Sequence, residues 1–209
     1  MPAAGNRQIR PLVGGIRVEG RRGTDRLAGA TLGLVIGADG PLFRFVTAGH
    51  AVGNPGDIVG QPELALIAGI VETNLLADGA DLAVVSGSVG VPAKVGGVWV
   101  DDNATITVKF DKPGLPDIGA NVVLQGATSG AVPGKVLHKN ADVRDGTTGE
   151  LARNVVVVDY THPTTIGDSG APVLASLQDG TPCYGLHGGF AIIDGKRVGW
   201  FTPFANVEW

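Results

Sequence analysis

The sequence predicts an all-β protein, and three observations carry that prediction. The 209 residues include 34 glycines and 13 prolines, a composition that suits many short strands joined by tight turns. Apolar residues gather in short runs that are rich in β-branched side chains and are bounded by Gly, Asp, Asn or Pro. No stretch shows convincing helical periodicity. We therefore expect a β-barrel or a β-sandwich.

The expected strands are spread along the whole chain. Residues 105–110 alternate polar and apolar side chains, as a half-buried strand does. Residues 112–119 hold two prolines and two glycines. A central strand does not tolerate such a composition, so this segment is expected to link two halves of near-equal length. The apolar runs are residues 32–36, 42–46, 82–85, 98–100, 122–124, 155–158 and 198–201.

Composition and charge exclude several classes of protein. Hydrophobic residues make up 44% of the chain and charged residues 17%, which is typical of a globular protein and not of a disordered one. The densest basic cluster is Arg17, Arg21, Arg22 and Arg26. It lacks neighbouring aromatic residues for base stacking, so we expect a solvated loop and no nucleic-acid partner. No apolar run is long enough to span a bilayer, so no membrane partner is expected.

The cysteine count bears on the cellular compartment. Cys183 is the only cysteine, so no intrachain disulfide can form, which favours a reducing compartment. The first eight residues contain no apolar stretch typical of a signal peptide. We expect a cytoplasmic protein. The alternative is a secreted protein from which a signal peptide has been removed.

Two motifs in the first half carry residues suited to acid–base chemistry. Residues 46–50 end a strand on small residues that present His50, whose ordinary pKa suits proton transfer near neutral pH. Asp81 opens the apolar run 82–85 and has the chemistry to orient an imidazole, although Asp78 competes for this role. Taken alone, such a histidine or aspartate is more often structural than catalytic.

The third motif lies in the second half, at residues 167–173. It places Ser169 between glycines on a sharp turn, where the hydroxyl is exposed and the backbone N–H groups of Gly167 and Ser169 form an oxyanion hole. The order of His50, Asp81 and Ser169, and their division between the halves, favour one catalytic triad over three unrelated turns.

The chain resembles the chymotrypsin-like serine proteases, most closely the bacterial branch that includes the streptogrisins and the glutamyl endopeptidases. The resemblance covers residues 12–206, nearly the whole chain. It rests on LVGG at 12–15, FVTAGH at 45–50, LQGATSG at 124–130, GKV at 134–136, TTIGDSG at 164–170, GLHGG at 185–189 and WFTP at 200–203.

This resemblance implies two six-stranded antiparallel β-barrels with the active site between them. Residues 1–11 would form an N-terminal arm, residues 12–112 the first β-barrel, and residues 113–209 the second β-barrel with the nucleophile, oxyanion hole and specificity pocket. It also implies peptide-bond hydrolysis through an acyl-enzyme intermediate, with no metal or organic cofactor.

The resemblance extends to the specificity pocket. Trypsin-like members bind basic side chains with an aspartate six residues before the serine, where this chain has Pro163. Glutamyl endopeptidases have a histidine on the pocket strand and a Thr or Ser five residues before the serine, and His187 and Thr164 match those positions. With Gly188 and Gly189 they form the expected substrate-binding set. Imidazole and hydroxyl donors hold carboxylates, so we expect Glu, or Asp or Gln, before the scissile bond. The alternative is that His187 only fills a strand position and the pocket accepts small apolar residues.

Several residues depart from the family pattern. Ala51 stands where a cysteine is common. In many relatives a freed N-terminus pairs with the aspartate before the serine, here Asp168, and Leu12 would be that terminus. The bond before Leu12 follows Pro11, a poor cleavage site, so Asp168 is expected to bind another cation or to need no such switch. Phe190 replaces a small residue that usually pairs with the substrate backbone.

Other functions stay open at this point. The double barrel can serve as a catalytically silent binding module, as a viral or phage-type protease that processes a polyprotein, or as a regulatory protease that a partner activates. The expected partners are a polypeptide substrate and an activating or companion protein. His138 and His162 are expected to be structural or surface residues.

Overall fold

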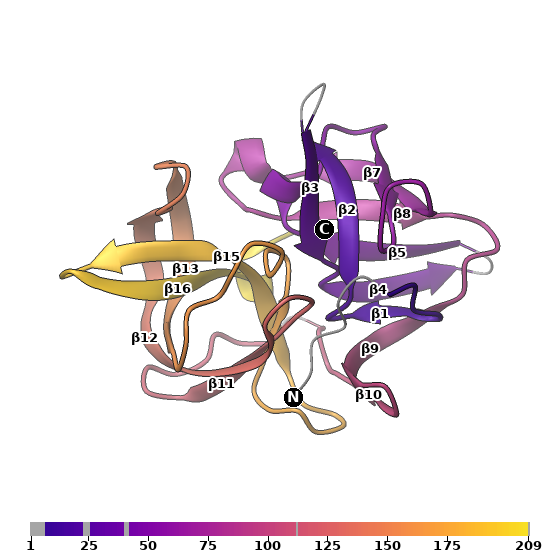
Figure 1. Ribbon diagram of the computed structural model, residues 1–209. Helices are drawn as coiled ribbons and strands as arrows, with labels where there is room; N and C mark the ends of the chain where they lie inside the picture. The colour runs from indigo at the N-terminus through magenta and orange to yellow at the C-terminus, as the bar shows by residue number, and fades with distance from the viewer. Residues whose placement is uncertain (1–6, 23–25, 40–41, 112, 209) are drawn as a thin grey trace.

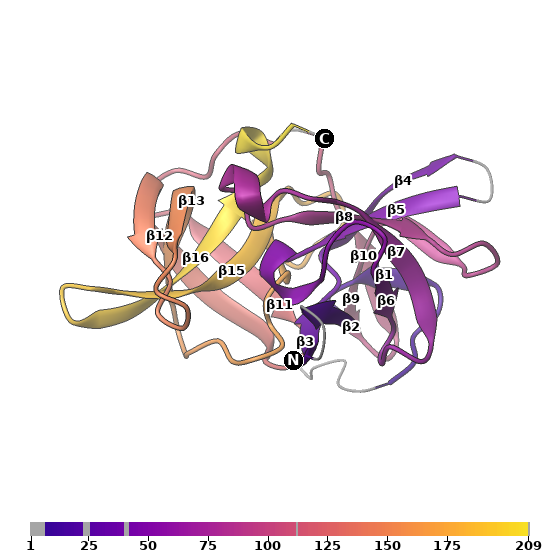
Figure 2. The ribbon, with the colours of Figure 1, turned by 90° about the horizontal axis from the view of Figure 1, so that it is seen from above.

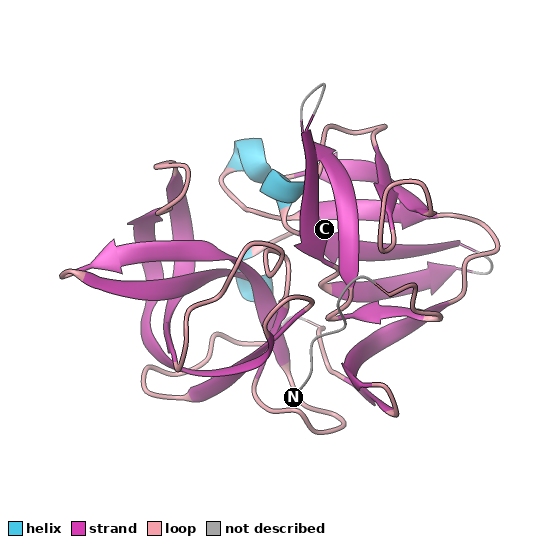
Figure 3. Cartoon of the chain, in the orientation of Figure 1, coloured by secondary structure: helices cyan, strands magenta, loops and turns pink. Residues whose placement is uncertain are grey.

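A computed structural model describes residues 7–22, 26–39, 42–111 and 113–208 (Figure 1). Within those residues the chain is almost entirely strands and loops, and the helices are three single turns of 3-10 helix (Figure 3). These helices are η1 (Gly49–Ala51), η2 (Leu76–Asp78) and η3 (Phe204–Asn206). None of the helices in these ranges has the length and hydropathy to cross a membrane.

The C-terminal half forms a closed six-stranded barrel in the order β11-β12-β13-β16-β15-β14. The strand pairs in it are antiparallel, as expected for the second barrel. The strands are β11 (Asn121–Gly126), β12 (Gly130–Arg144), β13 (Leu151–Tyr160), β14 (Pro172–Leu174), β15 (Cys183–Ile193) and β16 (Lys196–Pro203).

The N-terminal half is built differently from the closed six-stranded barrel that was expected. A seven-stranded sheet runs in the order β3-β2-β6-β7-β8-β5-β4, and a separate three-stranded sheet runs β1-β9-β10. The strands are β1 (Leu12–Gly14), β2 (Arg17–Arg22), β3 (Arg26–Thr31), β4 (Leu34–Asp39), β5 (Leu42–Thr47), β6 (Ile58–Gly60), β7 (Ile67–Asn74), β8 (Ala83–Gly87), β9 (Ala93–Asp101) and β10 (Ala104–Thr107).

The two N-terminal sheets nevertheless enclose one core. Leu12 of β1 and Trp99 of β9 pack in the same buried cluster as Phe45 and Val85 of the seven-stranded sheet. The backbones also meet closely, because a Cβ atom on Gly14 would lie only 2.2 Å from the carbonyl oxygen of Gly33. This half therefore closes by side-chain and backbone packing, and not by a continuous ladder of hydrogen bonds.

The halves lie side by side and share apolar contacts (Figures 1 and 2). One buried cluster joins Leu34 and Val46 of the first half to Leu174, Leu186 and Phe204 of the second. This shared cluster fixes the two halves against each other where the candidate site forms. The boundary between residues 112 and 113 stays a prediction, because residue 112, like residues 1–6 and 209, lies outside the described residues.

Cys183 provides a test of this packing. It is fully buried in β15, and burial raises the pKa of its thiol to about 12, so the reactive thiolate is scarce. We expect Cys183 in the native protein to react with a thiol reagent at least about 100-fold more slowly than in denaturant, because reaction requires opening of the barrel. Rapid labelling in buffer of a protein that keeps its native circular dichroism would contradict the described packing.

Candidate active site

His50 and Asp81 meet because their strands are neighbours. β5 and β8 pair in antiparallel register with Thr47 opposite Ala83. His50 follows β5 in the short turn η1, and Asp81 precedes β8. Because these strands are antiparallel, both residues lie at the same end of the strand pair. Asp78, the competing aspartate, is exposed in η2.

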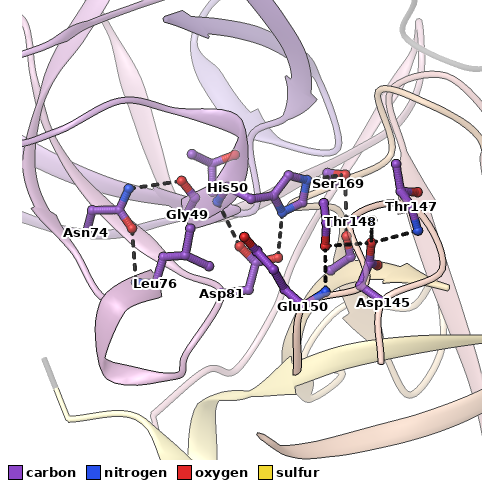
Figure 4. Close-up of polar contacts among 12 residues, drawn as sticks. Gly49, His50, Asn74, Leu76, Asp81, Asp145, Thr147, Thr148, Glu150 and Ser169 are labelled. Atoms are coloured by element: carbon purple, nitrogen blue, oxygen red, sulfur yellow. Dashed lines mark hydrogen bonds and ion pairs between the residues drawn. The ribbon is translucent and has the colours of Figure 1, made fainter. Parts of the chain in front are cut away.

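A continuous chain of hydrogen bonds joins Asp81, His50 and Ser169 (Figure 4). Oδ2 of Asp81 lies 2.7 Å from Nδ1 of His50, and Oδ1 accepts the backbone N–H of His50 at 2.8 Å. Nε2 of His50 lies 3.0 Å from Oγ of Ser169. One carboxylate thus holds both the ring and the backbone of His50, and the other ring nitrogen faces the serine hydroxyl.

Asn74 holds the turn that carries His50. Its side-chain amide donates to the carbonyl oxygens of Gly49 at 2.9 Å and Gly53 at 3.0 Å. Its oxygen accepts the N–H of Leu76 at 3.1 Å (Figure 4). The sequence analysis did not identify Asn74, since no motif marks it.

The serine loop leaves two amides free for an acceptor. Gly167 has φ +100° and Gly170 has φ +86°, a backbone region that favours glycine. Across the described chain, the backbone and side-chain hydrogen bonds do not use the N–H groups of Gly167 and Ser169 as donors. These are the two amides expected to form the oxyanion hole.

Asp168, between those residues, is fully buried. Its carboxylate accepts the N–H groups of Ser129 at 2.9 Å and Thr165 at 2.9 Å, and the Ser129 hydroxyl at 2.5 Å. Leu12, the residue considered as a new N-terminus, instead donates its N–H to the oxygen of Pro92 at 2.8 Å within the β1 region. Uncharged donors therefore hold Asp168, and the ion pairs of the described residues do not include it.

Thr31, which the sequence analysis missed, ties the serine loop to the first half. Its N–H donates to the oxygen of Ser169 at 2.8 Å. Its hydroxyl donates to the oxygen of Gly167 at 2.7 Å and accepts the N–H of Ala127 at 3.0 Å. Thr47, three residues before His50, donates its hydroxyl to the oxygen of Thr31 at 2.8 Å. Thr31 thus links the histidine strand to the serine loop.

His187 and Thr164, two of the expected pocket residues, contact each other. Nε2 of His187 lies 3.1 Å from Oγ1 of Thr164, and the ring meets Tyr160 edge-on at 5.6 Å between centroids. Burial is the main cause that lowers the pKa of His187 to about 4, although the charge of Asp168 acts in the opposite direction. The imidazole is therefore neutral near pH 7. His138 and His162 are exposed, as expected.

Strand β15 passes the serine at Gly188, and Gly189 is the next residue on the strand. The carbonyl oxygen of Gly188 lies 3.5 Å from Oγ of Ser169. The carboxylate of Asp145, at the tip of the β12–β13 hairpin, lies against Gly189, where a Cβ atom would be 2.4 Å from its Oδ2. The N–H of Gly146 donates to the oxygen of Phe190 at 2.7 Å. The hairpin tip thus already occupies the edge of β15 at Phe190.

Comparison with known proteins identifies solved structures with a similar fold. No protein-family model matches the chain, and a search of curated proteins finds no match. Among solved structures, protease A of Thermobifida fusca is 23% identical, with 91% of this chain and 90% of that chain covered and a TM-score of 0.68. Alpha-lytic protease homolog N4 is 19% identical, with 92% of each chain covered and a TM-score of 0.70. A glutamic acid specific serine protease is 20% identical, with 92% and 93% covered and a TM-score of 0.69.

The chain has the fold of the bacterial chymotrypsin-like serine proteases. The prediction of an all-β, double-barrel protein is confirmed, although the first half contains two sheets where one six-stranded barrel was expected. Within the described residues, no group of three or more His, Cys, Asp or Glu side chains is placed to hold a metal ion.

Replacing Thr31 tests the link between the halves. Thr31→Val keeps the shape of the side chain but leaves the buried oxygen of Gly167 and N–H of Ala127 without a partner. We expect the free energy of unfolding to fall by about 1–3 kcal/mol, because a buried polar group that loses its partner costs this much. Urea denaturation measures it. Thr31→Ser retains the hydroxyl and is the control, and a Val variant as stable as the Ser variant would refute the role of the hydroxyl.

The burial of His187 predicts a pH-dependent stability. Its pKa is about 4 in the folded chain and near the ordinary 6.5 when unfolded, so the unfolded state binds more protons between these values. The free energy of unfolding should therefore fall as the pH drops from about 6.5 to about 4. Urea denaturation at several pH values should show a shallower slope for His187→Gln and an unchanged slope for the exposed control His138→Gln.

A direct titration complements that comparison and needs no variant. The nuclear magnetic resonance signal of the His187 ring should stay that of the neutral form at about pH 5.5, where an ordinary histidine is mostly protonated. A ring that titrates near 6.5 would show that the imidazole is hydrated and would contradict the described burial.

Proposed function

We propose that this protein is a serine endopeptidase in which Ser169 is the nucleophile, His50 the general base and acid, and Asp81 the residue that orients the imidazole. The observation that carries the proposal is the hydrogen-bond chain from Asp81 through His50 to Ser169, at 2.7 and 3.0 Å. It joins residues that are 31 and 119 positions apart in sequence, in a chain with the fold of serine proteases. A structural serine on a turn has no need of this arrangement.

The proposed mechanism uses each of these groups in turn. Oγ of Ser169 attacks the scissile carbonyl carbon while Nε2 of His50 takes the hydroxyl proton. The carbonyl oxygen becomes an oxyanion and accepts the N–H groups of Gly167 and Ser169. His50 then gives its proton to the leaving amine as the peptide C–N bond breaks. Water, deprotonated by His50, hydrolyses the acyl ester, and the proton returns to Ser169.

Asp81 supports this cycle by its placement. Its side chain is 5% exposed and it accepts two hydrogen bonds from His50. The bond to Nδ1 keeps the hydrogen on that nitrogen, so Nε2 is the atom free to accept the serine proton. The negative charge also stabilises the imidazolium that forms during each proton transfer.

For the substrate we propose a polypeptide with an acidic residue, Glu in preference, before the scissile bond. His187, on β15, and Thr164, which it contacts, support this choice, and Gly188 and Gly189 would lie alongside the substrate. One structural neighbour is a glutamic acid specific serine protease that uses a histidine triad in substrate binding. Here the groups around His187 are different, since its ring contacts Thr164 and Tyr160. An activating or companion protein and a cytoplasmic location stay predictions.

A fluorophosphonate probe tests the nucleophile directly. We expect the wild-type protein to be labelled on Ser169, as located by mass spectrometry, and Ser169→Ala to remove the label. His50→Ala and Asp81→Asn should slow labelling by about 100-fold or more, because each removes or misorients the base. Ser86→Ala, an exposed serine on β8, is the control and should label like the wild type.

A folded wild-type protein that takes no label and cleaves no peptide would overturn the protease proposal. The double barrel acting as a binding module would then be the better explanation. Labelling that appears only after a companion protein is added would instead support a partner-activated protease.

A further inference from the structure

A cavity in the second barrel is lined by residues of the loop that leads to Ser169 and of the strand that passes it. It has a volume of about 180 Å³, and its lining includes Thr164, Phe190 and Arg197. Thr164 is on the loop that leads to Ser169. Phe190 is on β15, two residues after Gly188, whose oxygen lies 3.5 Å from the serine hydroxyl. The cavity therefore opens beside the strand that passes Ser169.

Arg197 lines this cavity as an exposed residue, and two contacts orient its guanidinium. Its central carbon lies 3.9 Å from the centroid of the Phe190 ring, and one of its terminal nitrogens donates to the oxygen of Thr164 at 3.0 Å. A guanidinium has five N–H donors in a planar fork. A single contact to Thr164 leaves the remaining donors for a ligand, and the stacking on Phe190 sets the plane in which they point.

Arg197 gives the cavity its net positive charge. Besides Tyr160, whose pKa is raised by burial, the other ionisable residues in the lining are Asp159, Lys196 and His162. Asp159 and Lys196 pair with each other at 2.6 Å, so their charges offset. The ion pairs found among the described residues do not include Arg197, which leaves its charge uncompensated by a carboxylate of the protein.

His187 does not supply this charge. Its side chain is 2% exposed, its Nε2 is engaged with Thr164, and burial keeps the ring neutral. A carboxylate that leaves water for a pocket loses its hydration, and a neutral hydrogen bond compensates this loss less well than a charged one. The residue that compensates an acidic ligand must therefore be a cation on the cavity wall.

We propose, on the basis of the protease function proposed above, that Arg197 is the specificity-determining residue of this cavity and binds the carboxylate of an acidic side chain that precedes the scissile bond. Thr164 and His187 then shape and polarise the pocket, while the guanidinium provides the charge. This assigns acid recognition to β16 and separates it from the histidine on β15.

Peptides that differ only in the residue before the cut test this assignment. We expect wild-type kcat/KM to be at least about 10-fold higher for Glu than for the isosteric, uncharged Gln. Arg197→Gln should lower the value for Glu by about 10- to 100-fold, the range of a charge-assisted hydrogen bond, and leave the value for Gln within about 3-fold. Arg197→Lys should recover part of the Glu activity. Arg21→Gln, an exposed arginine on β2, makes the same change in net charge and should leave both values unchanged.

A wild-type measurement covers the case in which the Arg197 variants do not fold. The preference for Glu over Gln should be the same at about pH 7.5 and about pH 9, because arginine stays charged across this range. The ring of His187 is neutral throughout, because burial lowers its pKa to about 4. A preference that vanishes as the pH rises to 9 would assign recognition to a titrating group and overturn the proposal.

The outcomes for the two proposals are distinguishable. If Ser169 is labelled and peptides are cleaved, but Arg197→Gln lowers Glu and Gln cleavage equally or the wild type does not favour Glu, the assignment of Arg197 is wrong and the protease function stands. If Ser169 takes no label and no peptide is cleaved, the protease proposal fails, and the assignment of Arg197 fails as well.

Discussion

The hydrogen bonds of Thr31 are the constraint on which the candidate site depends. A triad divided between two halves works only if the distance between the serine and the histidine is fixed to a few tenths of an ångström. Thr31 holds both sides, since it bonds the backbone of Ser169 and Gly167 and is itself bonded by Thr47 of the histidine strand. Thr31 and Thr47 are fully buried, so these bonds are shielded from water, which strengthens each of them.

The same reliance on packing and neutral hydrogen bonds appears at two other places in the structure. Ala51 follows His50 and is 2% exposed, and Val52 is 3% exposed. A Cβ atom on Gly20 of β2 would lie 2.8 Å from Val52, so the turn after His50 is pressed against the sheet without a covalent bond. Asp168 is likewise held by N–H and hydroxyl donors of Ser129 and Thr165, and not by a cation of the described residues.

Local features of the sequence predicted strands and candidate site residues correctly. Contacts between residues that are distant in sequence could not be predicted in this way. The apolar runs 42–46 and 82–85 overlap β5 and β8. The fifteen-residue strand β12 was missed because Gly130, Pro133 and Gly134 interrupt it and its pairing with β13 shifts register three times. His50, Asp81 and Ser169 stand in short motifs and were found. Thr31 and Arg197 act on residues 136 and 33 positions away, and no local pattern marks them.

The hydrogen bond between Gly146 and Phe190 has a consequence for how long a substrate can be. A peptide that extends along β15 past Gly189 must displace the hairpin tip, which belongs to the same chain and so competes at an effective concentration of about millimolar or higher. Turns built on Asp145, which accepts the N–H groups of Thr147 and Thr148 at 2.9 Å each, keep that competitor folded. In the proposed protease, residues far from the cut therefore add little to affinity, and recognition is concentrated in the side chain that Arg197 binds.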